Sequence, residues 1–156
     1  MNPIVQTVAA GIGSLGFALF FSLKGRHLIP AALGGMLSWA LYLLLDASGI
    51  EIFFSVFAAG AFASLYSEIV AMIGKAPAIL FRIPAFIPLV PGRDFYYTIE
   101  SAVNRDWAAF RENGLTTLIW VFALAGGTGA VAVFQKQLNN FKNKRKEKRE
   151  KRAKKH

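Results

Sequence analysis

The chain has 156 residues, of which 54% are hydrophobic, and it contains no cysteine. That composition exceeds the apolar usage of ordinary soluble domains, roughly 45–50% even with glycine counted, and it excludes disulfides and thiolate metal sites. Of 18 Lys and Arg, 11 lie in residues 136–156, so the body 1–135 is formally neutral and the basic charge describes a tail. We therefore expect no nucleic-acid partner, because nucleic-acid binding needs a basic folded surface.

Apolar segments recur along the body, and most are close to the length that crosses a bilayer. About 20 residues at ~1.5 Å per residue match a hydrocarbon core of roughly 30 Å. This pattern predicts an all-α polytopic membrane protein with a transmembrane domain over 1–135 and about five spans. The expected spans are 4–23, 28–45, 52–72, 76–92 and 115–134.

The charges between these segments predict the topology. Cytoplasmic loops carry an excess of Lys and Arg. Five spans place the loop 24–27, Lys75 and the tail on the cytoplasmic side, and Asp46 and Glu51 outside. Four spans with a re-entrant 76–92 would put the basic loop 24–27 outside, so five spans with the N-terminus outside fit better. No basic region precedes the first segment, so we expect a retained span instead of a signal peptide.

Two further segments flank the last span. Apolar residues at helical spacing predict an amphipathic helix over about 94–112 at the outer interface, anchored by Tyr97 and Trp107. The tail 136–156 is of low complexity and highly charged, which predicts a disordered or loosely helical segment. We interpret it as a topology anchor in contact with anionic lipid, and a specific partner site is the alternative.

The fourth segment carries Pro84, Pro88 and Pro91 inside an apolar run. Proline removes a backbone donor, so a helix there would leave the carbonyls of residues 80, 84 and 87 without partners. Irregular backbone survives at membrane depth only inside protein or beside water, and transporters use such discontinuous helices to bind solutes and ions. Freed carbonyls would suit an ammonium group, a cation or water. The alternative is a kinked helix whose prolines only shape packing.

Glu68 and Arg82 lie seven residues on either side of Lys75, where the chain is expected to turn. They should therefore reach similar depth and form a pair that lowers the cost of burying either charge. One interpretation is structural: a salt bridge, or an Arg82 side chain that extends to the inner surface. The other is functional, with Arg82 meeting a substrate carboxylate and Glu68 carrying a coupling proton.

Other motifs favour packing over chemistry. The run "GIGSLG" at 11–16 fits a dinucleotide motif on paper, but it lies inside an uncharged span and indicates small-residue helix packing. We interpret the glycines at 34, 35, 126, 127 and 129 in the same way. The two histidines, His27 and His156, have no neighbours suited to a metal site, and no catalytic arrangement is available. We expect neither an enzyme nor a bound cofactor.

A family resemblance rests on the proline segment. The run "KAPAILFRIPAFIPLVPG" at 75–92, followed by "FYYTI" and preceded by "LYSEIVAMIG", resembles the threonine/serine exporter family, as does "LIPAALGGMLSWALYLLL" at 28–45. The chain is similar to the small partner of its split, two-component form. Arg82, the Arg93–Asp94 pair and the long tail depart from the pattern expected of relatives.

The resemblance implies a ten-span transporter in the bacterial cytoplasmic membrane, with five spans from a larger partner subunit. It implies export of threonine and serine driven by the proton-motive force, with relatives linked to dicarboxylates such as succinate. The site residues favoured by the resemblance and the proline pattern are Pro84, Pro88, Pro91, Gly92 and Tyr96, with Glu68 as the ionisable candidate.

The sequence therefore predicts the small subunit of a heteromeric secondary transporter for small amino acids or related carboxylates. In the expected mechanism, freed carbonyls bind the substrate ammonium, a helix N-terminus near Asp94 binds the carboxylate, and Glu68 titrates with transport. One alternative is a non-transporting membrane subunit that assembles or stabilises a larger channel or enzyme. Another is a homo-oligomer, since so small a chain needs copies of itself or a partner to enclose a path.

Overall fold

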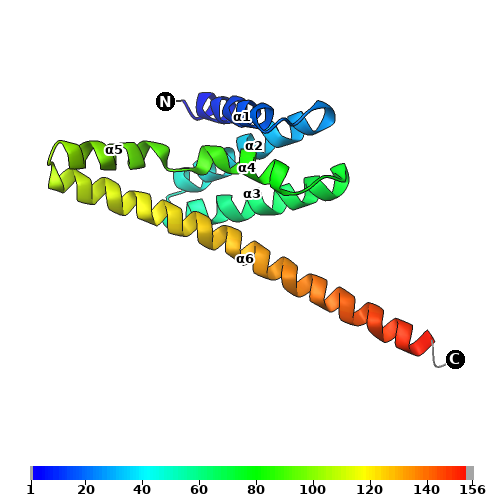
Figure 1. Cartoon of the computed structure of the whole chain (residues 1–156). Helices are drawn as coiled ribbons and strands as arrows, with labels where there is room; N and C mark the ends of the chain where they lie inside the picture. The colour runs from blue at the N-terminus through cyan, green and yellow to red at the C-terminus, as the bar shows by residue number, and fades with distance from the viewer. Residues whose placement is uncertain (1, 154–156) are drawn as a thin grey trace.

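The structure is a computed structural model that describes residues 2–153, with side chains to residue 137. All of its regular elements in this range are helical (Figure 1), which confirms the predicted all-α class. The elements are α1 (Pro3–Phe20), η1 (Gly25–His27), α2 (Leu28–Ala47), α3 (Ile52–Gly74), α4 (Ile79–Phe86), η2 (Ile87–Leu89), α5 (Gly92–Val103) and α6 (Trp107–Ala153).

Local sequence explains where the first helices begin and end. The side chain of Asn2 accepts a hydrogen bond from the N–H of Ile4 at 3.0 Å, and Pro3 occupies the first helical position. Asparagine caps and first-turn prolines are both favoured at helix starts. Lys75 ends α3 in the left-handed conformation with φ 51°, which turns the chain towards α4.

The chain is a multi-pass membrane protein by helix length and composition. Four stretches are long and apolar enough to cross a bilayer: Pro3–Phe20, Gly25–Ala47, Ile52–Gly74 and Trp107–Gln137. Large apolar side chains such as Phe20, Leu44 and Ile73 are exposed, whereas alanines and serines such as Ala63 and Ser67 are buried between helices. Small residues inside and large apolar residues outside are typical of helices that pack within lipid.

Glycines set two of the helix crossings. A Cβ added at Gly35 of α2 would overlap Ser14 of α1, and one at Gly127 of α6 would overlap the Phe57 carbonyl of α3. The packing interpretation is confirmed at these positions and at Gly34 and Gly126, where neighbours also lie close. The glycines at 13, 16 and 129 have nothing within 4 Å of the added atom, so no helix of this chain packs closely against them.

The fourth apolar segment is not one spanning helix. Its helical part, 79–89, is shorter than the helices that could cross a bilayer, so the expected count of five spans is not confirmed. Pro84 lies inside α4, Pro88 lies inside η2, and Pro91 precedes α5. Figure 1 shows that α4, η2 and α5 together run back in the direction opposite to α3, and α6 then returns.

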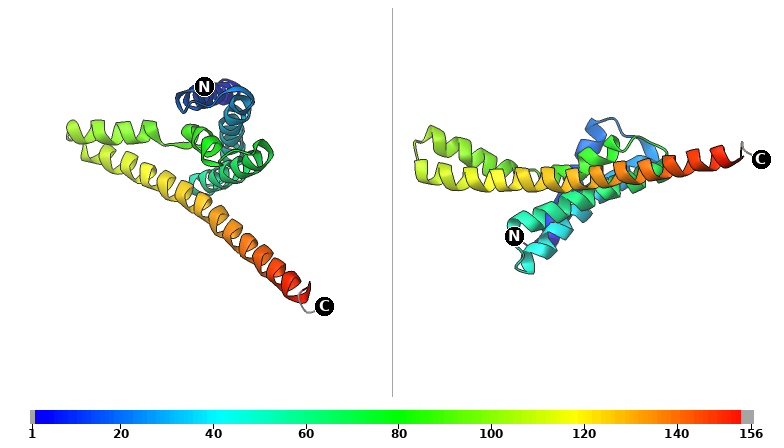
Figure 2. Two further views of the ribbon diagram at one scale, coloured as in Figure 1. Left: turned by 45° about the vertical axis from the view of Figure 1, so that its right-hand side comes forward. Right: turned by 90° about the horizontal axis from the view of Figure 1, so that it is seen from below.

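The amphipathic segment 94–112 is a helical hairpin, so the prediction of one helix there is wrong. α5 ends at Val103, Arg105 adopts the left-handed conformation with φ 58°, and α6 begins at Trp107. The Asp106 carboxylate accepts a hydrogen bond from the N–H of Ala109 at 3.1 Å, and this contact caps α6. The hairpin projects beyond the other helices (Figure 2).

α6 is much longer than the expected last span 115–134. It continues the backbone into the tail as far as Ala153, where the sequence predicts a disordered or loosely helical segment. The side chains beyond residue 137, and with them the predicted lipid contact of the tail, lie outside the described part.

Candidate functional site

The chain breaks between η2 and α5. Val90 is extended with ψ 127°, and Pro91 adopts φ −75° and ψ 53°. The N–H of Gly92 donates to the Val90 carbonyl at 2.7 Å, and the N–H of Val90 donates to the Ile87 carbonyl at 3.3 Å. The break is therefore a tight turn whose backbone is partly satisfied by its own bonds, and α5 starts from it without a side-chain cap.

A cavity of about 480 Å³ lies at this break. Its size falls within the roughly 300–1,000 Å³ of typical small-molecule sites. The break, the ends of α1, α2, α3 and α5 and an inner stretch of α6 line it: Gln6, Trp39, Tyr42, Leu43, Asp46, Ile52, Pro88, Val90, Pro91, Gly92, Arg93, Asp94, Thr116 and Trp120. Since α1 and α3 begin near it and α2 ends near it, the cavity lies at one end of the bundle.

Three aromatic side chains form one wall, and we call Trp39, Tyr42 and Trp120 the aromatic trio. The ring centroids of Tyr42 lie 5.0 Å from Trp39 and 4.9 Å from Trp120. Trp120 is only 7% exposed. The indole N–H groups of both tryptophans are buried and have no hydrogen-bond partner among the described residues.

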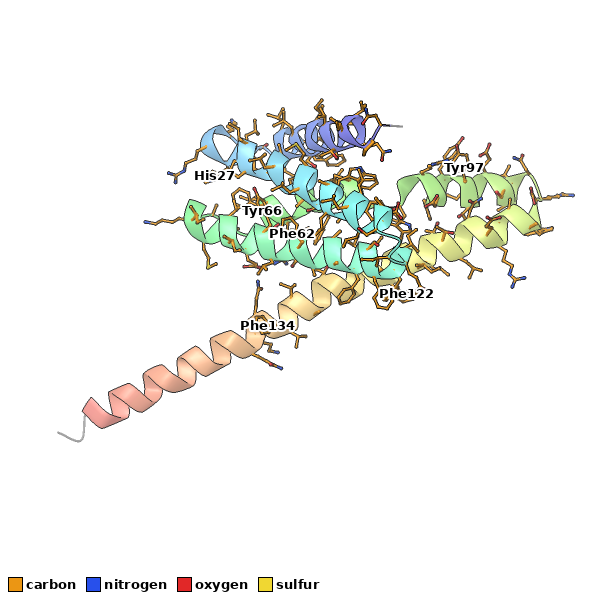
Figure 3. The ribbon with its side chains drawn as sticks, turned by 180° about the vertical axis from the view of Figure 1, so that it is seen from behind. His27, Phe62, Tyr66, Tyr97, Phe122 and Phe134 are labelled. Carbon is orange, nitrogen blue, oxygen red and sulfur yellow. The ribbon has the colours of Figure 1, made fainter. Side chains whose placement is uncertain are left out.

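The charged lining residues are two carboxylates and one guanidinium. Asp46 is near the end of α2, and Asp94 lies in the first turn of α5. The guanidinium carbon of Arg93 lies 5.6 Å from the ring centroid of Tyr97, so its charge interacts with an aromatic face. Figure 3 shows Tyr97 on the helix that leads away from the bundle. The cavity thus offers an excess of negative charge beside aromatic rings.

The structure brings three of the seven predicted site residues to this cavity and leaves four elsewhere, among them Glu68 and Arg82. Pro88, Pro91 and Gly92 line it. Tyr96 is 63% exposed and is not part of the lining, and Pro84 is fully buried.

The freed carbonyls are not arranged as predicted. The Ile87 carbonyl accepts the N–H of Val90 and is not free, which corrects the prediction for that position. Pro88 has no N–H for the Pro84 carbonyl. That carbonyl lies against α2, 3.0 Å from the place where a Cβ on Gly35 would stand. It faces packed protein at this point.

Glu68 and Arg82 form an ion pair between α3 and α4, as their spacing predicts. Their side chains are 28% and 26% exposed, and neither lines the cavity. The Nε of Arg82 is buried without a hydrogen-bond partner among the described residues. The pair lies towards the opposite end of the bundle, where His27 approaches Gly74 (Figure 3).

Sequence reasoning missed the aromatic trio and Asp46 as site residues. Asp46 was used only to predict the topology. Trp39 and Tyr42 were read as part of the apolar segment 28–45. One signal was available: Trp39, Tyr42 and Asp46 recur at spacings of three and four residues, which places them on one helix face. Nothing in the sequence indicates that Trp120 meets that face. Among the described residues, no group of three His, Cys, Asp or Glu could hold a metal ion.

Comparison with known proteins identifies the family. The sequence profile described as "Threonine/Serine exporter, ThrE" matches residues 6–134. This match covers α1 from Gln6 onward, α2 to α5, the apolar part of α6 and every residue that lines the cavity. No solved structure matches the chain. Because the match covers most of the chain, the protein belongs to the threonine/serine exporter family.

Proposed function

We propose that the chain is the small subunit of a heteromeric secondary transporter, and that the cavity at the helix break binds the exported solute. The observation that carries this proposal is the polar, partly charged cavity beside Pro88, Pro91 and Gly92 in a bundle of apolar helices. Polar and ionisable groups are costly within a membrane domain and mark solute or ion paths. The solute is a small amino acid or a related carboxylate, in keeping with the family.

The arrangement of the helices supports a partner. At most 39% of the residues in any candidate span are buried inside this chain. A single copy therefore leaves much helix surface for other subunits or lipid. We assign the larger subunit of the same exporter as the partner. Tyr96, exposed on α5, belongs to the surface that we propose faces it.

The orientation follows from the charges at the two ends. Residues 24–27 and Lys75 lie at the end of the bundle opposite Asp46 and the cavity. The basic tail is the last part of α6, and it lies far from the point where α6 begins (Figure 1). With the basic end in the cytoplasm of a bacterial cell, the N-terminus and the cavity are on the outer side. The proton-motive force would drive export, with Glu68 releasing and taking up the coupling proton beside Arg82.

Gly92 offers a direct test because it lines the cavity and has nothing within 4 Å of an added Cβ. Gly92→Leu should fill the cavity without disturbing the fold. Gly129→Leu is the matched control, since Gly129 has the same free space on α6 and does not line the cavity.

The assay is efflux of labelled serine, threonine and succinate from cells that express the chain alone, the chain with its partner, or neither. We expect efflux only with both subunits, abolished by Gly92→Leu and retained by Gly129→Leu. Efflux from the chain alone would favour a homo-oligomeric transporter. No efflux from any combination, with both proteins found in the membrane, would favour a non-transporting assembly subunit.

A further inference from the structure

We propose that the cavity selects its solute by the ammonium group, through Asp46, Asp94 and the aromatic trio, and that the solute carboxylate is dispensable for binding. The cavity would therefore take small amines as well as amino acids, and reject dicarboxylates. This inference rests on the proposed function, because it concerns the same cavity.

The first argument is charge. Asp46 and Asp94 both line the cavity, and both are acceptors that pair with an ammonium group. The single cation in the lining, Arg93, has its guanidinium placed over Tyr97. A dicarboxylate would bring two more negative charges to a space that already contains two carboxylates, and like charges close together repel strongly.

The second argument concerns the start of α5. The N-terminus of a helix attracts anions, because its first N–H groups lack intrahelical partners and the helix dipole is positive there. In this helix Asp94 already supplies a negative charge in the first turn. A solute carboxylate would therefore gain little binding free energy at the N-terminus of α5. The sequence alone predicts this N-terminus as the carboxylate site.

The third argument is the aromatic wall. Ammonium groups are attracted to the faces of tryptophan and tyrosine rings, and clusters of such rings form cages for cations. Trp39 and Trp120 flank Tyr42 at ring-centroid distances of 5.0 and 4.9 Å. The indole N–H groups of Trp39 and Trp120 are buried away from this space, so we assign the aromatic wall to the ammonium group alone.

The experiment uses the tryptophans of the cavity as reporters. The chain has three tryptophans, of which Trp107 is 66% exposed at the hairpin tip, so Trp107→Phe leaves only the two in the cavity. This variant is purified in lipid nanodiscs together with the larger subunit, whose own tryptophans are replaced by phenylalanine, and is titrated with serine, ethanolamine, glycerate and succinate while tryptophan fluorescence is recorded. Ethanolamine lacks the carboxylate of serine, and glycerate replaces its ammonium by a hydroxyl.

We expect serine and ethanolamine to bind with affinities within about tenfold of each other, and glycerate and succinate to bind at least tenfold more weakly than serine, since an unmatched charged partner is costly. Asp46→Asn and Asp94→Asn should each weaken serine and ethanolamine at least tenfold. Glu100→Gln removes a carboxylate from α5 outside the cavity and should change neither. Circular dichroism confirms that each variant stays folded.

The outcomes separate the two proposals. Serine binding that survives both aspartate substitutions, or glycerate binding as tight as serine, overturns the ammonium assignment and leaves the cavity as the solute site. Succinate binding tighter than serine overturns it as well. If no compound changes the fluorescence of the folded protein, both the ammonium assignment and the placement of the solute in this cavity are wrong.

Discussion

The contact between α3 and α6 predicts opposite effects for two nearby glycines. A Cβ on Gly127 would overlap the Phe57 carbonyl and lie 3.0 Å from the Ala61 amide nitrogen. These are backbone atoms, which cannot rotate away as a side chain can. Gly127→Ala therefore forces α6 away from α3, and overpacking of this kind costs about 1–3 kcal/mol.

Helix propensity opposes part of that cost. Alanine is more favourable than glycine inside a helix by about 1 kcal/mol. The net loss for Gly127→Ala is therefore at most about 2 kcal/mol, because the propensity gain offsets part of the steric cost. Gly129→Ala meets nothing within 4 Å and keeps only the gain, so it should be neutral or stabilising.

Thermal unfolding in detergent, followed by circular dichroism, measures the difference. For a chain of this size 1 kcal/mol corresponds to about 2–4 °C in Tm. Gly127→Ala should therefore melt below the wild type, by at most about 8 °C, and Gly129→Ala at or above it. Equal melting temperatures for the two variants would refute the close crossing of α3 and α6 at Gly127.

Three other predictions concern the ion pair, a half-buried tyrosine and the helix break. Glu68→Gln should destabilise the protein by leaving Arg82 without its partner, and the double variant with Arg82→Gln should recover part of the loss in Tm, because an unpaired charge costs more than no charge. Tyr66→Phe removes the 2.8 Å hydrogen bond to the Pro30 carbonyl and should cost about 1 kcal/mol in chemical denaturation. Pro88→Ala restores a backbone N–H in η2 and should reduce efflux while membrane abundance stays normal.

Each of these three predictions has a control or an outcome that would contradict it. If the double charge variant also loses the pH dependence of export, Glu68 is part of proton coupling; unchanged pH dependence assigns the pair to structure alone. Tyr96→Phe, at an exposed ring, should leave stability unchanged. Pro77→Ala, at an exposed loop proline, should leave efflux unchanged, and equal effects of Pro77→Ala and Pro88→Ala would speak against a specific role of the break.

The sequence predicted those features that depend on neighbours along one helix or across one turn. The helical class follows from apolar segments of bilayer length. The pairing of Glu68 with Arg82 follows from their equal distance to the turn at Lys75. Close glycine crossings follow from the small residues in the spans, although sequence alone does not say which glycine meets a neighbour: Gly127 does and Gly129 does not.

Other features depend on the fold as a whole. The helical spacing of apolar residues continues through 104–106, and neither glycine nor proline marks the turn there. Arg105 adopts a left-handed conformation that its residue type seldom shows, and the one local signal for the turn is Asp106, a residue type favoured as a helix N-cap. Likewise the aromatic trio joins α2 to α6, and only tertiary packing brings Trp120 to Tyr42.

The prolines shape the site by redirecting the chain more than by exposing carbonyls. The Ile87 carbonyl is bonded within the turn, and the Pro84 carbonyl packs against α2. What changes at Pro91 is the neighbour of the helix: α4 packs among α1, α2 and α3, whereas α5 leaves them and packs on α6. That departure opens the space between the end of α2 and α6, and Asp94 enters it on the first turn of α5. Substitutions that straighten the break should therefore remove the cavity itself, whereas substitutions of its carboxylates should change only what it binds.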